Sequence, residues 1–334
     1  MGVTIKDIAK ASGFSKSTVS RVLMNDQNVN DNTRKKIRTI MEQMGYENNE
    51  LARGMVKGRI NIVLVIVGEL QHSSYALSLR EIEHVLYEAG YMVAICISEY
   101  NTQKEFRYLQ LANQFHFSGV ILMTAIETPD LHQLLTRLRC PVVSINRSIS
   151  QPQIDTVILD NFKGAYDITK YLIEMGHSSI LHVSGPSNSS TGMERKRGYL
   201  AAMSDAGITV SDDMVYEGNL LLEGGIHAVE HMLERLPEAT AVFAGSNRMA
   251  EGVMQGCVSY GVEVPQRVSV TCFDHVQSPE LLHVPLTTVG NDTGIMGMSA
   301  AQMLLKRIEG DDGPTQILVY PCEIVEGKSV KKLC

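Results

Sequence analysis

TIKDIAKASGFSKSTVSRVLM, residues 4–24, predicts two short helices joined by a tight turn. Thr4 is a candidate N-cap of the first helix, and Asp7, three residues later, places a carboxylate near the free backbone N–H groups. Gly13 interrupts the helical spacing at the point where a tight turn requires a positive φ. The stretch therefore predicts a helix, a turn and a second helix within about 20 residues.

The second helix is expected to begin after Ser15 and to bury an apolar side that contains Val19 and Val22. Its other side carries four residues that can donate hydrogen bonds to phosphates or base edges: Lys16, Ser17, Ser20 and Arg21. This arrangement predicts a helix-turn-helix whose second helix enters the major groove of DNA. The alternative is a small helical hairpin that binds nothing, because short motifs also occur by chance.

The length of 334 residues predicts two or three domains, and the charge is divided unequally along the chain. Residues 1–60 contain eleven Lys and Arg against six Asp and Glu, a net charge of +5, so the net charge of −7 for the whole chain leaves −12 on the remainder. A basic N-terminal part on an acidic body favours a polyanionic partner at one end only.

Composition and motifs argue against several other classes of protein. The six cysteines are dispersed without a C-x-x-C pair or a Cys/His cluster, so we expect reduced thiols and no metal site. His227 and His231 share a helical face, but no third ligand is evident, and a solvated face is the better interpretation. No signal-peptide core or long apolar run is present, and no cofactor motif or catalytic constellation emerges. We therefore expect a cytoplasmic protein that is not an enzyme and has no cofactor, catalytic residue or membrane segment.

A third helix is expected to start after a cap at Asn30 and to end at Gly45, which completes a three-helix domain over residues 1–46. Residues 47–59 are polar, include two glycines and have weak helical character. They predict a hinge segment that has little order by itself.

From residue 60 to residue 334, strand-like runs alternate with amphipathic helices, which is typical of doubly wound parallel sheets. The predicted buried strands are 60–67, 91–97, 119–124, 141–146, 179–184, 241–245 and 268–274, and the clearest predicted helices are 76–90 and 161–176. The length favours an α/β body of two lobes. Ligands of such folds bind at the carboxyl ends of the strands, which here means the cleft between the lobes.

Head, hinge segment and body together resemble the lactose-repressor (LacI/GalR) family of bacterial transcription regulators. The motifs that carry the resemblance are VTIKDIAKASGFSKSTVSRVL, NVNDNTRKKI and MGY in the head, and YEAGY, GVIL, EMGHSSI, VSGP, NRMAEGV, FD and PLTTV in the body. The resemblance implies a body like the periplasmic sugar-binding proteins, forming a homodimer whose two heads bind a pseudo-palindromic double-stranded DNA operator. It also implies a repressor controlled by a small-molecule effector in the cleft.

The resemblance assigns roles to residues of the head and the hinge segment. Bases are expected to be read by Lys16, Ser17 and Arg21, and Met55, preceded by Arg53, is the expected wedge in the minor groove. The residues expected to hold phosphates are Thr4, Ser15, Thr18, Asn28, Thr33 and Tyr46. We predict that the hinge segment orders only on specific DNA.

In the cleft, the expected effector-binding residues are Ser74, Tyr75, Arg147, Met193, Ser246, Asn247 and Asp274. The family commonly places an arginine at the position of Met193, where its fork would clamp sugar hydroxyls, and methionine cannot do this. A sugar or sugar derivative is the expected effector, while a nucleoside, another non-sugar ligand or control by a protein partner stays open. Arg147 follows a strand end where it can meet an anion.

The sequence leaves the direction and the assembly of the regulator open. Both induction and corepression are compatible with the sequence. The sequence does not identify the operator or the effector. No heptad tail follows PLTTV, so we expect a dimer rather than a tetramer. An enzyme or a sugar carrier with an incidental head is the least favoured alternative, since no catalytic constellation and no signal peptide accompany it.

Overall fold

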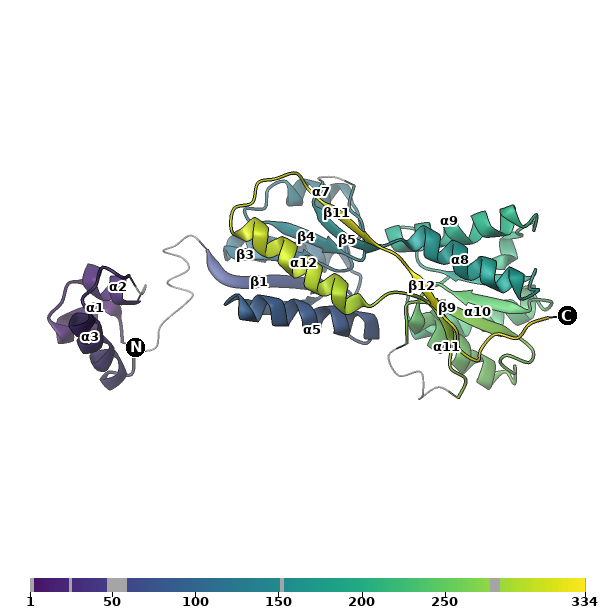
Figure 1. The fold of residues 1–334 in the computed structure, drawn as a ribbon, viewed down its shortest axis with the longest axis horizontal. Helices are drawn as coiled ribbons and strands as arrows, with labels where there is room; N and C mark the ends of the chain where they lie inside the picture. The colour runs from purple at the N-terminus through teal and green to yellow at the C-terminus, as the bar shows by residue number, and fades with distance from the viewer. Residues whose placement is uncertain (1–2, 24–25, 47–58, 151–152, 277–282, 334) are drawn as a thin grey trace. The chain divides into compact units, whose positions relative to one another are not determined.

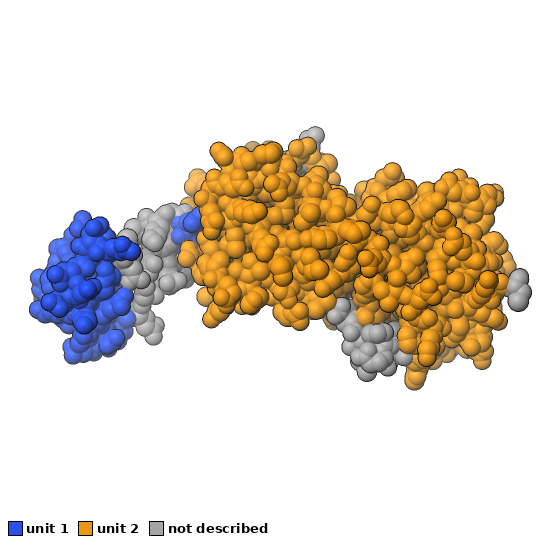
Figure 2. Space-filling view, in the orientation of Figure 1, with its two compact units in different colours: residues 1–60 blue, residues 61–334 orange. Residues whose placement is uncertain are grey.

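The structure is a computed structural model that describes residues 3–23, 26–46, 59–150, 153–276 and 283–333. It divides into two units, Met1–Ile60 and Asn61–Cys334, which we call the head and the body (Figure 2). Residues 47–58, which hold Arg53, Met55 and most of the predicted hinge segment, lie outside the described residues.

The head consists of the helices α1 (Ile5–Ser12), α2 (Lys16–Leu23) and α3 (Asp31–Gln43) (Figure 1). Gly13 has a φ of 75°, so the turn between α1 and α2 adopts the left-handed conformation that the sequence predicts. The buried apolar residues of the head are Ile8, Val19, Val22, Val29, Ile37 and Met41. All three helices contribute to or flank this small core, as the predicted three-helix domain requires.

Side chains at the helix starts of the head satisfy free backbone N–H groups, as the sequence predicts. The Asp7 carboxylate accepts from the Thr4 backbone N–H at 3.0 Å and from the Thr4 hydroxyl at 2.6 Å. The Ser15 hydroxyl oxygen accepts from the backbone N–H of Thr18 at 3.1 Å. The Asn30 side chain likewise accepts a backbone N–H in the first turn of α3. These local caps fix where each helix begins.

The body contains two six-stranded sheets, one in each lobe (Figure 1). In spatial order, the first sheet is β11 (Ile317–Tyr320), β5 (Asp155–Leu159), β4 (Val142–Ile145), β3 (Phe117–Leu122), β1 (Ile60–Val67) and β2 (Met92–Ile97). The second is β12 (Glu323–Val325), β10 (Thr287–Gly290), β9 (Ser269–Phe273), β8 (Ala241–Ala244), β6 (Ile180–Ser184) and β7 (Val215–Glu217). The second sheet is parallel except that β12 runs antiparallel to β10.

The strands largely follow the predicted runs, with one correction. The run 91–97 was expected to be buried, but β2 lies at the edge of its sheet, and Met92 is 67% exposed. An edge strand is covered on fewer sides than a central one, so an apolar run alone does not establish burial.

Helices cover both sheets. The first lobe has α5 (Ser73–Glu88), α6 (Thr102–Gln114), α7 (Pro129–Leu135) and α12 (Thr293–Ile308). The second lobe has α8 (Asn161–Glu174), α9 (Ser190–Asp205), α10 (Leu222–Arg235), α11 (Asn247–Ser259) and a short 3₁₀ helix, Asp212–Met214. The predicted helices 76–90 and 161–176 correspond to α5 and α8. No described helix is long and apolar enough to cross a membrane.

Within the described residues, the chain passes between the lobes after β5, after β10 and after β11 (Figure 1). Hydrogen bonds join these crossovers: the Asp160 backbone N–H donates to the Tyr320 carbonyl at 2.8 Å, and the Asn291 amide donates to the Pro321 carbonyl at 2.7 Å. The crossovers therefore lie side by side and bring the carboxyl ends of both sheets together.

Candidate functional site

The outer side of α2 is the candidate DNA-binding face of the head. Lys16, Ser17 and Arg21 are exposed there, whereas Ser20 is half-buried. The Arg21 side chain is 66% exposed, and its Nε lies 4.0 Å from the Asp26 carboxylate. An exposed ion pair of this length is weak, so the guanidinium can exchange Asp26 for a base edge or a phosphate at small cost.

Hydroxyl groups gather at the start of α2. The Ser15 hydroxyl lies 2.7 Å from the Ser17 hydroxyl and 2.9 Å from the Thr18 hydroxyl. Backbone N–H groups at a helix N-terminus favour an anion, and short hydroxyl side chains add further donors. The Thr4 hydroxyl already donates to Asp7, so a phosphate contact by that hydroxyl would compete with this bond.

The other predicted phosphate-binding residues of the head differ in exposure. Asn28 is exposed, and its amide donates to Asp26 at 3.0 Å. Thr33 is half-buried in the first turn of α3. Tyr46 is half-buried and packs against the apolar core of the head.

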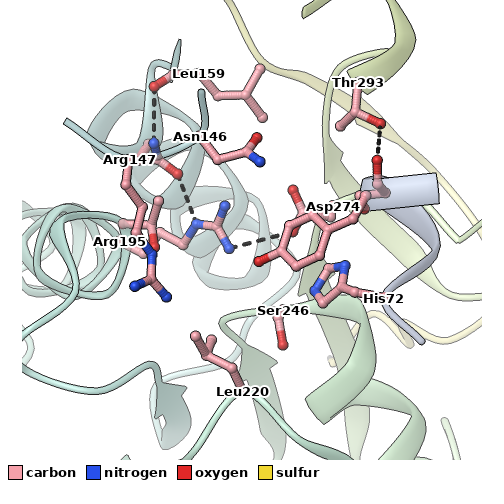
Figure 3. Close-up of a pocket in the computed structure, with 13 residues that line it drawn as sticks. His72, Asn146, Arg147, Leu159, Arg195, Leu220, Ser246, Asp274 and Thr293 are labelled. Carbon is pink, nitrogen blue, oxygen red and sulfur yellow. Dashed lines mark hydrogen bonds and ion pairs between the residues drawn. The ribbon is translucent and has the colours of Figure 1, made fainter. Parts of the chain in front are cut away.

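A pocket lies in the body where the carboxyl ends of the strands of both lobes meet (Figure 3). Its lining residues are His72, Ser74, Tyr75, Asn146, Arg147, Leu159, Asn161, Thr191, Arg195, Leu220, Ser246, Asp274 and Thr293. Most of them end a strand, lie in the loop that follows it or begin the next helix, as parallel α/β folds place their ligand contacts.

Arg195 of α9 is held in the pocket by several contacts (Figure 3). It is 8% exposed, and its Nε donates to the Asn161 amide oxygen at 2.8 Å. Its Nη1 donates to the Gly245 carbonyl at 2.6 Å and lies 3.5 Å from the Asp274 carboxylate. The guanidinium carbon lies 3.7 Å from the centre of the Phe273 ring. These contacts fix the orientation of a fork that can bind hydroxyl or carboxylate oxygens.

Asp274 directly follows β9 and has a φ of 68°. A positive φ at an aspartate is uncommon, and here it accompanies the placement of the carboxylate next to Arg195. The Arg195–Asp274 pair offers donors and an acceptor side by side, which suits a ligand with several hydroxyl groups.

His72 and Tyr75 form a second wall of the pocket, with stacked rings whose centres are 4.4 Å apart. Burial lowers the pKa of His72 to about 4, although the Asp274 carboxylate acts in the opposite direction. His72 is therefore neutral near pH 7 and can accept or donate a hydrogen bond. Burial also raises the pKa of Tyr75, which keeps its hydroxyl protonated.

Five of the predicted effector-binding residues line this pocket: Ser74, Tyr75, Arg147, Ser246 and Asp274. Asn247 lies behind it, where its amide donates to the Ser74 hydroxyl and the His275 carbonyl, each at 3.3 Å. The structure thus brings together most of the predicted set and places one member in a supporting layer.

Met193 is not part of the pocket, which corrects the expectation that it occupies the place of the family's arginine. It is 47% exposed and lies in a neighbouring groove, while Arg195, two residues later, enters the pocket. The buried residues of α9 recur with helical spacing at Gly192, Arg195 and Tyr199. Residue 193 falls outside this buried stripe, because two residues along a helix turn the side chain by about 200°.

Sequence reasoning missed eight lining residues: His72, Asn146, Leu159, Asn161, Thr191, Arg195, Leu220 and Thr293. Some of them could have been predicted from their positions just after the predicted strands. Asn146 directly follows β4, and Asn161 begins the helix after β5. Thr191 lies in the first turn of α9, whereas Leu220 lies in the loop between β7 and α10 and has no comparable signal, since its place depends on how that loop folds.

Buried polar atoms without a hydrogen bond cluster on the first-lobe side of the cleft. Among the described residues they include Glu69 Oε1, His72 Nδ1, the Thr124 hydroxyl and Asn146 Nδ2. Each of these residues follows the carboxyl end of a strand of the first sheet. Native proteins rarely leave buried polar groups unpaired, so this cluster is a place for a polar ligand or ordered water.

The described residues contain no group of three or more His, Cys, Asp and Glu side chains placed to hold a metal ion. His231, one of the two histidines with helical spacing, bonds through Nε2 to the Asp213 carbonyl at 2.8 Å and contacts the Tyr216 ring.

Family models match both units of the chain. Residues 4–49 match the family described as bacterial regulatory proteins, lacI family. Residues 61–326 match the family of periplasmic binding proteins and the sugar binding domain of LacI family.

Similar proteins span the whole chain. Catabolite control protein A of Priestia megaterium is 31% identical over 99% of this chain and 100% of its own length. The transcriptional repressor PurR of Proteus mirabilis is 31% identical over 98% of this chain and 96% of its own. The transcriptional regulator DegA of Bacillus subtilis is 29% identical over 100% of this chain and 99% of its own.

Two solved structures have a similar arrangement. The complex of the transcriptional regulator CelR with cellobiose has a TM-score of 0.75 at 27% identity and covers 98% of this chain and 99% of its own. The lac repressor dimer bound to operator and the anti-inducer ONPF has a TM-score of 0.85 at 21% identity, covers 99% of this chain and 100% of its own, and shares the fold.

Proposed function

The chain belongs to the LacI family of bacterial regulatory proteins. On this premise we propose that it is a repressor whose affinity for a pseudo-palindromic operator is controlled by a small polyhydroxylated ligand. It is a DNA-binding transcriptional regulator with a ligand-binding body, like its relatives. We further propose a homodimer, since two identical heads on a two-fold axis read two half-sites.

For DNA, we propose that Lys16, Ser17 and Arg21 contact base edges while the hydroxyls around Ser15 hold phosphates. The exposure of these side chains on α2 supports this division. Arginine can bind guanine with two parallel hydrogen bonds, whereas short hydroxyls suit the backbone. Because DNA lies in the bacterial cytoplasm, we place the protein there, acting as a regulator rather than as an enzyme.

For the ligand, the observation that carries the proposal is the buried Arg195 fork, held by Asn161 and Asp274 on the wall of the pocket. Donors and acceptors fixed beside one another bind vicinal hydroxyl groups of a sugar better than they bind an apolar molecule. CelR, a similar regulator, was solved with the sugar cellobiose, which supports the same class of ligand here. Met193, which favours a different kind of effector because it cannot clamp sugar hydroxyls, lies outside the pocket.

The pocket has walls from both lobes, so a ligand bound there contacts both and favours one arrangement of the lobes over another. The hydrogen-bonded crossovers between the lobes are the segments that absorb such a change. Ligand and operator then influence each other's binding reciprocally, typically by about 1–3 kcal/mol. Both induction and corepression are compatible with this mechanism.

Two measurements on the full-length protein test the proposal. Selection from random DNA duplexes should enrich one pseudo-palindrome, and its affinity should fall steeply with salt. A set of neutral sugars, sugar acids, sugar phosphates and nucleosides should include a compound that raises the melting temperature and changes operator affinity.

Asp274→Asn is the matched variant for the ligand, since it keeps the size of the side chain and removes its charge. It should lose the ligand effect while retaining DNA binding without ligand. Enrichment of no DNA sequence either without ligand or in the presence of each compound, or a sugar response that the variant retains in full, would contradict the proposal.

A further inference from the structure

Arg147 is a buried guanidinium on the pocket wall, and no residue that the structure describes forms an ion pair with it. It is 3% exposed and lies two residues after Ile145, the last residue of β4. Its Nη1 donates to the carbonyl of Thr124 at 2.7 Å and to that of Ala125 at 3.3 Å. Its guanidinium carbon lies 5.7 Å from the centre of the Tyr100 ring. These partners are uncharged, and no carboxylate in the described part of the chain lies within 4.0 Å of it.

Two other largely buried guanidiniums of the body are neutralised by carboxylates. Arg195 lies 3.5 Å from Asp274, and Arg307 lies 2.6 Å from Asp155. A buried charge without a counter-charge is costly, which is why such charges are normally paired. Asp274 is already engaged with Arg195, so Arg147 adds a positive charge to the pocket that this carboxylate does not balance.

The charged and titratable groups that face Arg147 do not supply a full counter-charge. They are Tyr75 on α5, Tyr100 after β2 and Glu105 on α6. Burial raises the pKa of both tyrosines, so both are neutral. Burial also raises the pKa of Glu105 to about 7 against the opposing effect of Arg147, so near neutral pH Glu105 is ionised in only part of the molecules.

Asn146, the residue before Arg147, adds a hydrogen-bond donor to the same pocket wall. The Asn146 Nδ2 is buried on the pocket wall and makes no hydrogen bond, and Figure 3 shows its amide directed toward the middle of the pocket. The Asn146 backbone N–H donates to the Val157 carbonyl at 2.9 Å, which holds this residue in place. A guanidinium and a neighbouring amide N–H together bind the oxygens of a carboxylate or a phosphate.

We propose that the ligand carries an anionic group, a carboxylate or a phosphate, which binds to Arg147 and Asn146 while Arg195 and Asp274 hold its hydroxyl groups. This inference rests on the proposed function, since it concerns the same pocket. It narrows the ligand from sugars in general to sugar acids or sugar phosphates.

The test compares matched sets of ligands on the full-length protein by calorimetric titration. For each of glucose, galactose and mannose, the set contains the neutral sugar, its uronate and its 6-phosphate, with inorganic phosphate as an additional probe. In at least one set, an anionic member should bind at least tenfold more tightly than the neutral sugar. The uronate and phosphate arms identify which anion the site accepts.

Arg147→Gln should remove the preference for the anionic member and leave binding of the neutral sugar within about threefold of the wild type. Arg197→Gln is the matched control, because Arg197 is exposed on α9 and pairs with Glu194 outside the pocket. This control removes the same charge from the protein and should leave the preference unchanged.

Glu105→Gln provides a second variant in case the first does not fold. Glu105 and the ligand anion share Arg147, so wild-type affinity for a uronate should rise severalfold as the pH falls from 8 to 6. Glu105→Gln should bind the uronate more tightly at pH 8 and show a flatter pH profile. The uronate is the probe for this arm, because phosphate itself titrates in this range.

The binding results distinguish failure of the anionic-ligand inference from failure of the proposed function. Equal binding of neutral and anionic members, unchanged by Arg147→Gln, would overturn this inference and leave the proposed sugar-responsive regulator intact. If no sugar in any set bound, the proposed ligand class itself would be overturned.

Discussion

The DNA-binding face of the head and the ligand pocket of the body hold their candidate functional residues in opposite environments. On α2, Lys16 and Arg21 are exposed and cover a core that other residues form. In the pocket, Arg147 and Arg195 are only 3% and 8% exposed. We conclude that function and stability are separable for these exposed side chains of α2, whereas in the pocket the same side chains serve both.

Arg195→Ala is expected to have the largest effect and tests the pocket side of this comparison. Removing the guanidinium leaves the Asp274 carboxylate buried without its partner and the Asn161 amide oxygen without its donor. The free energy of unfolding of the body should fall by about 3–5 kcal/mol, measured by urea denaturation. Lys196→Ala, at an exposed neighbouring position on α9, should unfold like the wild type. Equal stability of Arg195→Ala and wild type would break the comparison.

Arg21→Ala tests the head side of the comparison. Its binding to the selected operator should weaken by about 1–3 kcal/mol with relaxed base preference, while unfolding stays unchanged because the side chain is exposed. Lys16→Ala should also relax base preference. Fluorescence anisotropy on specific and unrelated duplexes measures both effects.

Lys35→Ala is the control for these variants, because this exposed lysine on α3 is expected to act through phosphates. It should weaken binding to all duplexes alike. If the three variants had the same effect on specific and unrelated DNA, the division between base and phosphate contacts would be refuted.

Glu105→Gln tests the buried side of this comparison through the pH dependence of the free energy of unfolding. The pKa of Glu105 is raised from 4.5 to about 7, so the folded protein binds more protons than the unfolded chain between these values. The contribution of Glu105 to the free energy of unfolding therefore falls as the pH rises from 4.5 to about 7. A glutamine does not titrate, so the variant should gain about 1–2 kcal/mol relative to wild type between pH 5 and pH 8. Urea denaturation at both pH values measures the difference, and a constant difference would contradict the assignment.

Gly13→Ala is expected to have the smallest effect and compares the backbones of the two units. Gly13 has a φ of 75° with open space where a Cβ would lie, so the cost should be about 1 kcal/mol from conformation alone. Gly261 in the body has a φ of 66° and the same open surroundings. Calorimetric melting should show Gly13→Ala lowering the transition of the head and Gly261→Ala that of the body. A shift in the other unit would show that the two do not unfold independently.

Much of the fold could be predicted because its signals are local. The caps at Ser15 and Asn30 and the turn at Gly13 depend on residues within one helical turn of one another. The strands of the body were found because a central parallel strand is a continuous apolar run. At β2 this rule failed, since sheet order rather than composition decides which strand is at the edge.

The candidate pocket could be predicted only in part. Asp274 and Arg147 follow strand ends, so the rule for parallel sheets locates them without knowledge of their neighbours. The expectation that position 193 corresponds to the family's pocket arginine failed for a different reason. A resemblance gives an approximate position, but the direction of a side chain on α9 changes by about 100° with each residue.

By itself, the sequence determined the three helices of the head, the exposed donors of α2, the two-lobed α/β body and the family to which the chain belongs. Tertiary structure decided that Arg195 rather than Met193 enters the pocket and that Asp274 pairs with it. It also buries Arg147 with no carboxylate of the described residues within ion-pair distance. The physical reason is the range of the interactions. Caps, turns and periodicity act over a few residues, whereas burial and ion pairing depend on groups that lie far apart in the chain and meet only when it folds.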